Sequence, residues 1–201
     1  EFLMQPTSYS DLELPKYFDF GPLLRAVRTA MSSKQLRGVI DSDFKVRDLA
    51  DVNYTILRNK DGRYAWRPIQ LIHPVVYVAL VNKMTESDHW DTIRNRFKHF
   101  SNDLRISCCS IPVESQTEQT DKAEQILGWW RHVEQRSVEL ALEYDYVVHT
   151  DISDCYGAAY THSIAWALHG KDVAKAKRGD SSLIGNNIDG FLQDARYGQT
   201  N

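Results

Sequence analysis

The sequence lacks the features that mark membrane, secreted and zinc-binding proteins. No apolar run approaches the length needed to cross a bilayer. No charged-then-apolar leader stands at its start. The three cysteines, Cys108, Cys109 and Cys155, have no spacing typical of a metal site or a disulfide framework. These absences predict a cytoplasmic protein without a membrane partner, in a compartment that keeps thiols reduced.

A strong net charge is also missing. The formal net charge of the 201 residues is -3, so bulk charge gives no indication of nucleic-acid binding. Basic residues gather locally instead, over 58–67 and over 171–178. The apolar fraction of 42% and the charged fraction of 25% are ordinary for a globular protein. The length suits one domain or two small lobes.

Local patterns in the first half predict helices around one β-hairpin. Residues 1–17 read as an extended arm, and Gly21-Pro22 opens a helix that reaches Met31. Two β-prone runs, 54–58 and 64–71, flank the turn residues Asp61-Gly62. Pro74 begins another helix. Thr85 with Asp88 resembles a capping box that starts the next one.

The second half is expected to hold two strands between helices. The patterns predict a strand over 106–111, a helix over 116–144 and a strand over 144–150. A helix over 163–168, a basic loop over 171–180 and a helix over 184–195 follow. Helices and strands do not alternate regularly, so the predicted class is α+β.

The run from Thr150 to Tyr156 carries the strongest chemical pattern. Asp151 and Asp154 lie three positions apart at the end of the expected strand. Mg²⁺ prefers carboxylate and carbonyl oxygens and is usually held by one or two carboxylates plus substrate phosphates. A lone aspartate at this position would more often form an N-cap or an Asx turn. The neighbouring residues shift the interpretation toward a metal-nucleotide site.

This run, Thr150-Asp151-Ile152-Ser153-Asp154-Cys155-Tyr156, resembles the first catalytic block of reverse transcriptases. With the following residues 157–163 it is most similar to the bacterial group that includes retron and phage-defence enzymes. Residues 60–69 followed by His73-Pro74 resemble the family's fingers segment. Residues 187–201 resemble the lead-in to its Gly-x-Pro-Gln-Gly block. The likeness reaches from about residue 54 to the end.

The resemblance implies a role for each matching position. Asp151 and the Ile152 carbonyl would bind two Mg²⁺ ions, with Mn²⁺ as a substitute. Tyr156 would lie under the sugar and exclude a 2′ hydroxyl. The remaining implied positions contact the phosphates of the incoming nucleotide: Ser153, Asp154, Cys155, Arg67 and Lys60. Arginine suits this task because its planar fork matches phosphate oxygens.

The resemblance also implies an organisation and partners. Residues 1–53 would be an N-terminal arm with helices, 54–115 the fingers, and 116–201 a partial palm. The partners would be an RNA template, a DNA primer and dNTPs, with an associated non-coding RNA in some relatives. The sequence does not distinguish between three biological settings of the family: retrons, group II introns and antiviral defence.

Structural interpretations stand beside these roles. Arg67 and Lys60 could be ordinary solvent-exposed side chains of a hairpin. Tyr156 could pack in a core. Asp154 could simply cap a helix. The second basic run could follow a nucleic-acid backbone, or form an ordinary charged loop. Its members are Lys171, Lys175, Lys177 and Arg178.

One departure from the family pattern limits the expected activity. The family completes its metal site with an aromatic-x-Asp-Asp segment, and this sequence contains no Asp-Asp pair. It begins without Met and ends in a polar run, so we expect it to be a piece of a longer chain. We expect the piece alone to be inactive. Two alternatives remain: a polymerase-derived nucleic-acid-binding module, and a palm-type nucleotidyl cyclase, which would need a Gly-Gly-Asp/Glu hairpin that the residues after Tyr156 lack.

Overall fold

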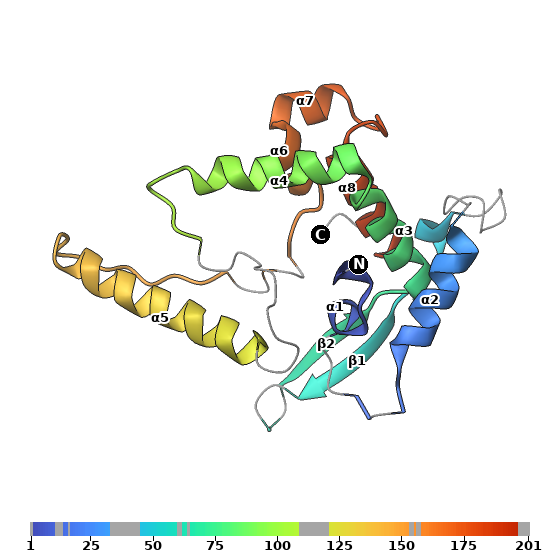
Figure 1. Ribbon diagram of the computed structural model, residues 1–201, viewed down its shortest axis with the longest axis horizontal. Coiled ribbons are helices and arrows are strands. Elements are labelled where there is room, and N and C mark those ends of the chain that lie inside the picture. Colours follow the sequence, from blue (N-terminus) through green and yellow to red (C-terminus); the bar gives the residue numbers. More distant parts are fainter. Residues whose placement is uncertain are drawn as a thin grey trace. The chain divides into compact units, whose positions relative to one another are not determined.

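The computed structural model describes residues 2–10, 14–15, 17–32, 45–59, 62–63, 65–108, 121–152, 155 and 158–196. Helices dominate, and the described strands form one two-stranded antiparallel hairpin (Figure 1). The predicted α+β class is therefore confirmed, and its reverse-transcriptase-like architecture stays a prediction. No helix in the described part of the chain is long and apolar enough to cross a membrane.

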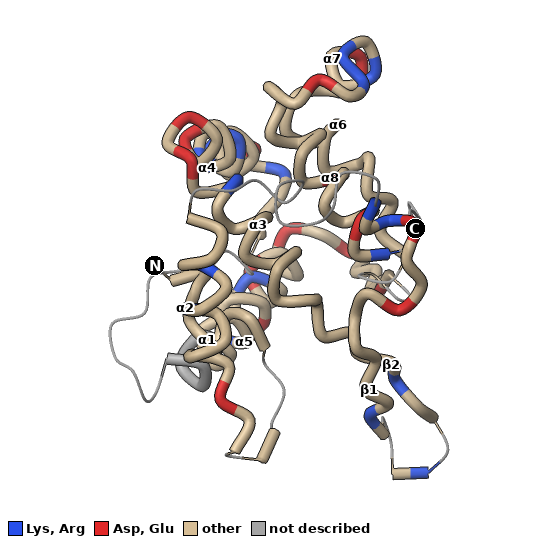
Figure 2. The backbone as a smooth tube through the Cα atoms, turned by 90° about the vertical axis from the view of Figure 1, so that its right-hand side faces the viewer, with Lys and Arg blue, Asp and Glu red and all other residues tan. Residues whose placement is uncertain are grey.

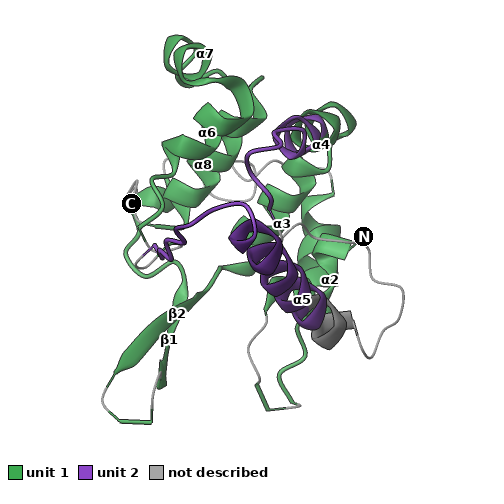
Figure 3. Ribbon diagram, turned by 90° about the vertical axis from the view of Figure 1, so that its left-hand side faces the viewer, with its two compact units in different colours: residues 1–94, 155–201 green, residues 95–154 purple. Residues whose placement is uncertain are grey.

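The chain divides into two compact units (Figure 3). Unit 1 contains residues 1–94 and 155–201, and unit 2 contains residues 95–154. The boundary at 154/155 falls inside the run that resembles a catalytic block. The predicted fingers and palm bounds concern polymerase lobes, and they stay predictions. Each unit is described separately below.

The first described residues of unit 1 form two short helical segments. A 3-10 turn, η1 (Phe2–Met4), precedes α1 (Pro6–Tyr9). The predicted extended arm is therefore wrong for these residues. Pro6 suits a first helical turn, and the Tyr9 ring packs edge-on against Phe20 and Tyr77. The Tyr9 ring, the partly buried Met4 and a hydrogen bond from the Tyr77 hydroxyl to the Leu3 carbonyl hold the segment against the core.

Helix α2 (Phe20–Met31) begins close to where the sequence predicts. The Asp19 side chain accepts a hydrogen bond from the Gly21 amide at 2.8 Å and so caps the first turn. Leu24 and Met31 are buried, and they pack in one cluster with Val78 and Ala79. The sequence spacing predicts an apolar face of Leu23, Leu24, Val27 and Met31. Leu24 and Met31 confirm it and Val27 is half-buried, but Leu23 is 42% exposed, so the prediction is wrong at that position.

The predicted hairpin and the helix after it are both confirmed. Strands β1 (Tyr54–Asn59) and β2 (Trp66–Leu71) pair antiparallel. Gly62 lies in the turn at φ 73°, where a residue without a side chain is least strained. Helix α3 (Pro74–Met84) starts at its proline and buries Val76, Val78, Ala79 and Val81. A short 3-10 helix, η3 (Val46–Asp48), adds Val46 to the core beside Val76.

The C-terminal part of unit 1 is a helical group. It consists of α6 (His162–His169), α7 (Lys171–Ala176) and α8 (Ile184–Asp194). Ile184 and Ile188 of α8 pack with Ile93, as the predicted apolar spacing of the last helix requires. Part of the predicted basic loop is wrong, because 171–176 are helical. Ala174 is buried there, and Gly170 at φ 85° separates α6 from α7.

Unit 2 contains the end of α4 (Ser87–Ser101) and helix α5 (Asp121–Ala141). The predicted strand over 144–150 is wrong, since these residues have no β pairing among the described residues. The described part of the other predicted strand, 106–108, is not a strand either, and 109–111 lie outside the described residues. The capping box at Thr85 is also wrong. Its hydroxyl donates backward to the Val81 carbonyl and ends α3.

Candidate functional site

Asp151 lies at the surface of unit 2, after the irregular segment 144–150. One carboxylate oxygen, Oδ1, accepts a hydrogen bond from the Ile152 amide at 2.8 Å. Ile152 is itself 70% exposed. An exposed carboxylate is chemically suited to a hard cation. However, no group of three or more His, Cys, Asp or Glu side chains able to hold a metal ion is found among the described residues. Asp151 alone is too few ligands for the two Mg²⁺ ions of the predicted site.

Most other positions of the predicted nucleotide site cannot be placed. Ser153, Asp154, Tyr156 and Lys60 lie outside the described residues. Cys155 is described as exposed with a free thiol, and it belongs to unit 1. The predicted contacts of these residues with a nucleotide therefore stay predictions.

Arg67 is exposed on strand β2, with Arg58 directly opposite on β1. Figure 2 shows the basic positions on both strands of this hairpin. Like charges directly opposite each other in a β-ladder repel and destabilise the pair. The pairing therefore concentrates positive charge on the hairpin, and a bound anion would relieve the repulsion. The sequence marks Arg58 only as part of a basic run, because the register that opposes it to Arg67 is a structural fact.

Two lysines of the second basic run lie over one tryptophan ring. Lys171 and Lys175 lie on α7, and their Nζ atoms stand 5.1 and 5.8 Å from the centroid of the Trp166 ring. Lys177 and Arg178 follow in the exposed turn after α7. The four basic residues are therefore grouped at one end of the α6–α8 group, and Trp166 adds an aromatic surface to them.

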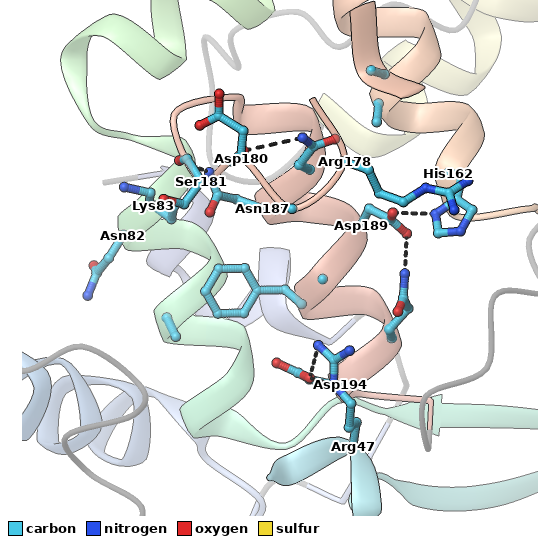
Figure 4. A pocket seen from close by; sticks show the side chains of 18 of the residues that line it. Arg47, Asn82, Lys83, His162, Arg178, Asp180, Ser181, Asn187, Asp189 and Asp194 are labelled. Carbon is cyan, nitrogen blue, oxygen red and sulfur yellow. Dashed lines mark hydrogen bonds and ion pairs between the residues drawn. The ribbon is translucent and has the colours of Figure 1, made fainter. Parts of the chain in front are cut away.

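A large cleft of about 1230 Å³ lies within unit 1 (Figure 4). Its wall comes from the ends of α2 and α3, from η3 and from α6, α7 and α8. Trp166, Lys175 and Arg178 all contribute to it, as do Arg28 and Lys83. The sequence could not predict this cleft, because its wall joins residues from Arg28 to Asp194.

Three of the acidic residues that line the cleft contact a basic or imidazole side chain. Asp194 accepts from Arg47 at 3.0 Å, and Glu86 pairs with Lys83 at 2.9 Å. Asp189 is only 8% exposed and contacts His162 through Nδ1, a pair drawn in Figure 4. Gln193 also donates to Asp189, at 2.8 Å. These contacts satisfy the buried carboxylate, which would otherwise be strongly destabilising.

The comparisons with known proteins identify no family. No family model matches the chain. No curated protein matches it significantly. The functional interpretation therefore rests on the residues themselves and on their arrangement in the two units.

Proposed function

We propose that this chain supplies the fingers and the first half of the palm of an RNA-directed DNA polymerase. The observation that carries the proposal is the run from Thr150 to Ser163, with Asp151 and Tyr156 at the spacing of the first catalytic block of reverse transcriptases. The parent enzyme would add dNMP units to the 3′ hydroxyl of a DNA primer on an RNA template. The second set of carboxylates would come from residues beyond this sequence, because it contains no Asp-Asp pair.

Two features of the described residues support this proposal. The Asp151 carboxylate is exposed and makes one local hydrogen bond, so it is accessible to a cation. The opposed Arg58 and Arg67 concentrate positive charge on an exposed hairpin. Phosphoryl transfer depends mainly on positioning and charge neutralisation, for which these residue types are suited.

Each residue has a defined task in the proposed reaction. Asp151 and the Ile152 carbonyl would provide oxygen ligands for divalent ions, which would supply positive charge for activating the attacking hydroxyl and stabilising the leaving pyrophosphate. Arg67 binds the outer phosphates of the dNTP, and Lys60 assists it. Tyr156 excludes a 2′ hydroxyl. Ser153, Asp154 and Cys155 line the triphosphate. A cytoplasmic role in antiviral defence is one setting that such an enzyme would suit.

Asp151→Asn in the parent chain tests the metal-ligand role. The substitution removes the charge with little change in volume, so incorporation should fall at least about a thousandfold, a loss of roughly 4 kcal/mol of transition-state stabilisation, while the fold is retained. The measurement is extension of a labelled primer on an RNA template. Asp145→Asn is the matched control, because Asp145 is another exposed acid of unit 2. Retained incorporation in Asp151→Asn would rule out this ligand role.

Tyr156→Ala tests the proposed sugar selection. Loss of the ring opens space for a 2′ hydroxyl, so the preference for dNTP over NTP should fall by about tenfold or more, roughly 1.4 kcal/mol. The ratio of kcat/KM for a matched dNTP and NTP measures it. Tyr156→Phe keeps the ring and should keep the preference. Equal discrimination in the parent and in Tyr156→Ala would contradict the role.

The alternative of a non-catalytic binding module is distinguished by the same assay. It is favoured by the lack of an Asp-Asp pair in this sequence. A parent chain that binds primer-template but incorporates no nucleotide, with Mg²⁺ and dNTP present, would support this alternative over polymerisation.

A further inference from the structure

The cleft of unit 1 combines the two kinds of group that bind single-stranded nucleic acid. Such proteins place cations along the strand and aromatic rings against its bases. Trp166 is half-buried in the wall of the cleft, and Lys175 and Arg178 share that wall. Trp166 and Lys175 are already in contact, with 5.8 Å between the ammonium and the ring centroid. Lys171 also lies over this ring, at 5.1 Å, and the Tyr160 ring packs against it at 5.5 Å. A base would therefore stack on Trp166 by displacing a lysine side chain, whose ammonium group would then meet the adjoining phosphate.

The positive charge in the cleft is not fully neutralised. Asp194 and Glu86 form ion pairs with Arg47 and Lys83, and Asp189 contacts the His162 ring. The carboxylate of Asp180 accepts a hydrogen bond from the Ser182 amide at 2.9 Å. Within the described residues, no ion pair involves the remaining lining cations, Arg28, Lys175 and Arg178. Figure 4 shows Arg178 directed along the cleft toward His162.

The volume favours a strand over a small molecule. Pockets for small ligands measure about 300–1,000 Å³ and are mostly apolar. This cleft has about 1230 Å³, and charged and amide side chains contribute much of its wall. An extended polyanion with flat, stackable units fits such a wall better than a compact apolar ligand does. An acidic peptide would use the cations but would leave Trp166 without a matching group.

We infer that this cleft binds single-stranded nucleic acid, with one base stacked on Trp166 and the adjoining phosphates held by Lys175 and Arg178. The inference goes beyond the proposed polymerase function, because it requires neither Asp151 nor a metal ion. It predicts binding by the whole chain in the absence of Mg²⁺ and dNTP. Failure of incorporation would therefore leave it unaffected.

Binding of a fluorescent single-stranded RNA oligonucleotide to the full chain tests the inference. Trp166→Ala should weaken binding by about 5- to 150-fold, the range for loss of one stacked base. Trp166→Phe, which keeps a ring, should retain most of the affinity. Trp90→Ala is the matched control, because Trp90 is a partly exposed tryptophan of α4 that does not line the cleft. It should bind as the parent does.

The salt dependence separates the phosphate contact from the base contact. Arg178→Ala should reduce the slope of log affinity against log salt by about 0.7, the value for one lost phosphate contact on a single strand. Arg131→Ala, an exposed arginine of α5 in unit 2, should leave the slope unchanged. With an abasic strand, Trp166→Ala should have no effect and Arg178→Ala should keep its effect.

Several results would overturn the inference. They are absence of strand binding by the folded chain, parental affinity in both Trp166→Ala and Arg178→Ala, and equal weakening by the two controls. Binding of a mononucleotide as tightly as the oligonucleotide would replace the strand with a small ligand. Circular dichroism of each variant verifies folding, and Arg178→Ala tests the site independently if Trp166→Ala does not fold.

Discussion

At the residue scale, two tyrosines whose rings pack together, Tyr9 and Tyr77, make the stability of the fold depend on pH. The Tyr9 hydroxyl donates to the Ile72 carbonyl, and the Tyr77 hydroxyl donates to the Leu3 carbonyl. Burial, with a smaller contribution from Tyr77, raises the pKa of Tyr9 to about 12, and burial also raises the pKa of Tyr77. Both phenols therefore lose their proton at a higher pH in the folded state than in the unfolded state.

This difference predicts a loss of stability in alkali. The folded pKa of Tyr9 lies above the unfolded value, so its contribution is complete below about pH 10 and disappears as the pH rises toward 12. The free energy of unfolding should fall by up to about 2–3 kcal/mol across that interval. Tyr9→Phe should lose about 1 kcal/mol at neutral pH with its hydrogen bond, and should then decline less in alkali.

Urea unfolding at several pH values measures this decline. Tyr54→Phe is the control, because Tyr54 is 71% exposed and should show the full parental decline. Tyr77, whose pKa is also raised by burial, should contribute to the decline that remains in Tyr9→Phe. A Tyr9→Phe variant with the same alkaline loss as the parent would show that burial of this phenol does not govern the effect.

At the element scale, the contact between α6 and α8 depends on one glycine. A β-carbon at Gly185 would lie 2.7 Å from the Ala165 Cα and 2.8 Å from the His169 Cδ2. The Gly185 amide also donates to the His169 ring at 3.0 Å. The two helices approach each other too closely at this point for any side chain.

Gly185→Ala should therefore lower the free energy of unfolding by about 1–3 kcal/mol, the usual effect of overpacking. Gly190→Ala is a matched control on the same helix, since its β-carbon would meet nothing within 4 Å. It should be neutral or stabilise by up to about 1 kcal/mol through helix propensity. Thermal unfolding of both variants measures the contrast, and equal stability of the two would contradict the close approach.

The elements that the sequence predicts well are those with local determinants. Pro74 begins α3, Asp61-Gly62 marks the hairpin turn, and the apolar spacing of α8 places Ile184 and Ile188 in the core. Elements that depend on distant partners are predicted poorly. Residues 144–150 are β-prone, but a strand needs a neighbour, and none is found for them among the described residues. The charged residues of 171–176 predict a loop, but this segment is helix α7, in which Ala174 is buried.

The same reason limits what the sequence predicts of the candidate sites. Asp151 and Arg67 can be selected from motifs within a few residues. The Arg58–Arg67 pairing requires the strand register, and the Asp189–His162 contact joins positions 27 apart. The cleft around Trp166 requires packing of helices that are far apart in the sequence. Each of these depends on tertiary structure, which local patterns do not contain.

At the scale of the whole molecule, the two units differ in how much they bury. Every buried hydrophobic residue of the described chain belongs to unit 1, with Leu24, Val78 and Ile184 the most enclosed. In unit 2, the described side chains of α5 include exposed Ile126, Trp130 and Val138. Among the described α5 side chains only Val133 and Leu140 are half-buried and the others are exposed. Such a helix depends largely on local interactions, which are marginal in water.

The rates of amide hydrogen exchange should therefore differ between the two units. Amides of α5 should exchange at least about tenfold faster than those of α3 and α8, because opening a helix of unit 2 exposes little additional apolar surface. Mass spectrometry of peptides from the intact chain measures this difference. Adding a single-stranded oligonucleotide should slow exchange in α6 and α7, which line the cleft, and leave α5 unchanged. Equal protection of α5 and α8 in the free chain would show that unit 2 is stabilised by contacts beyond its local ones.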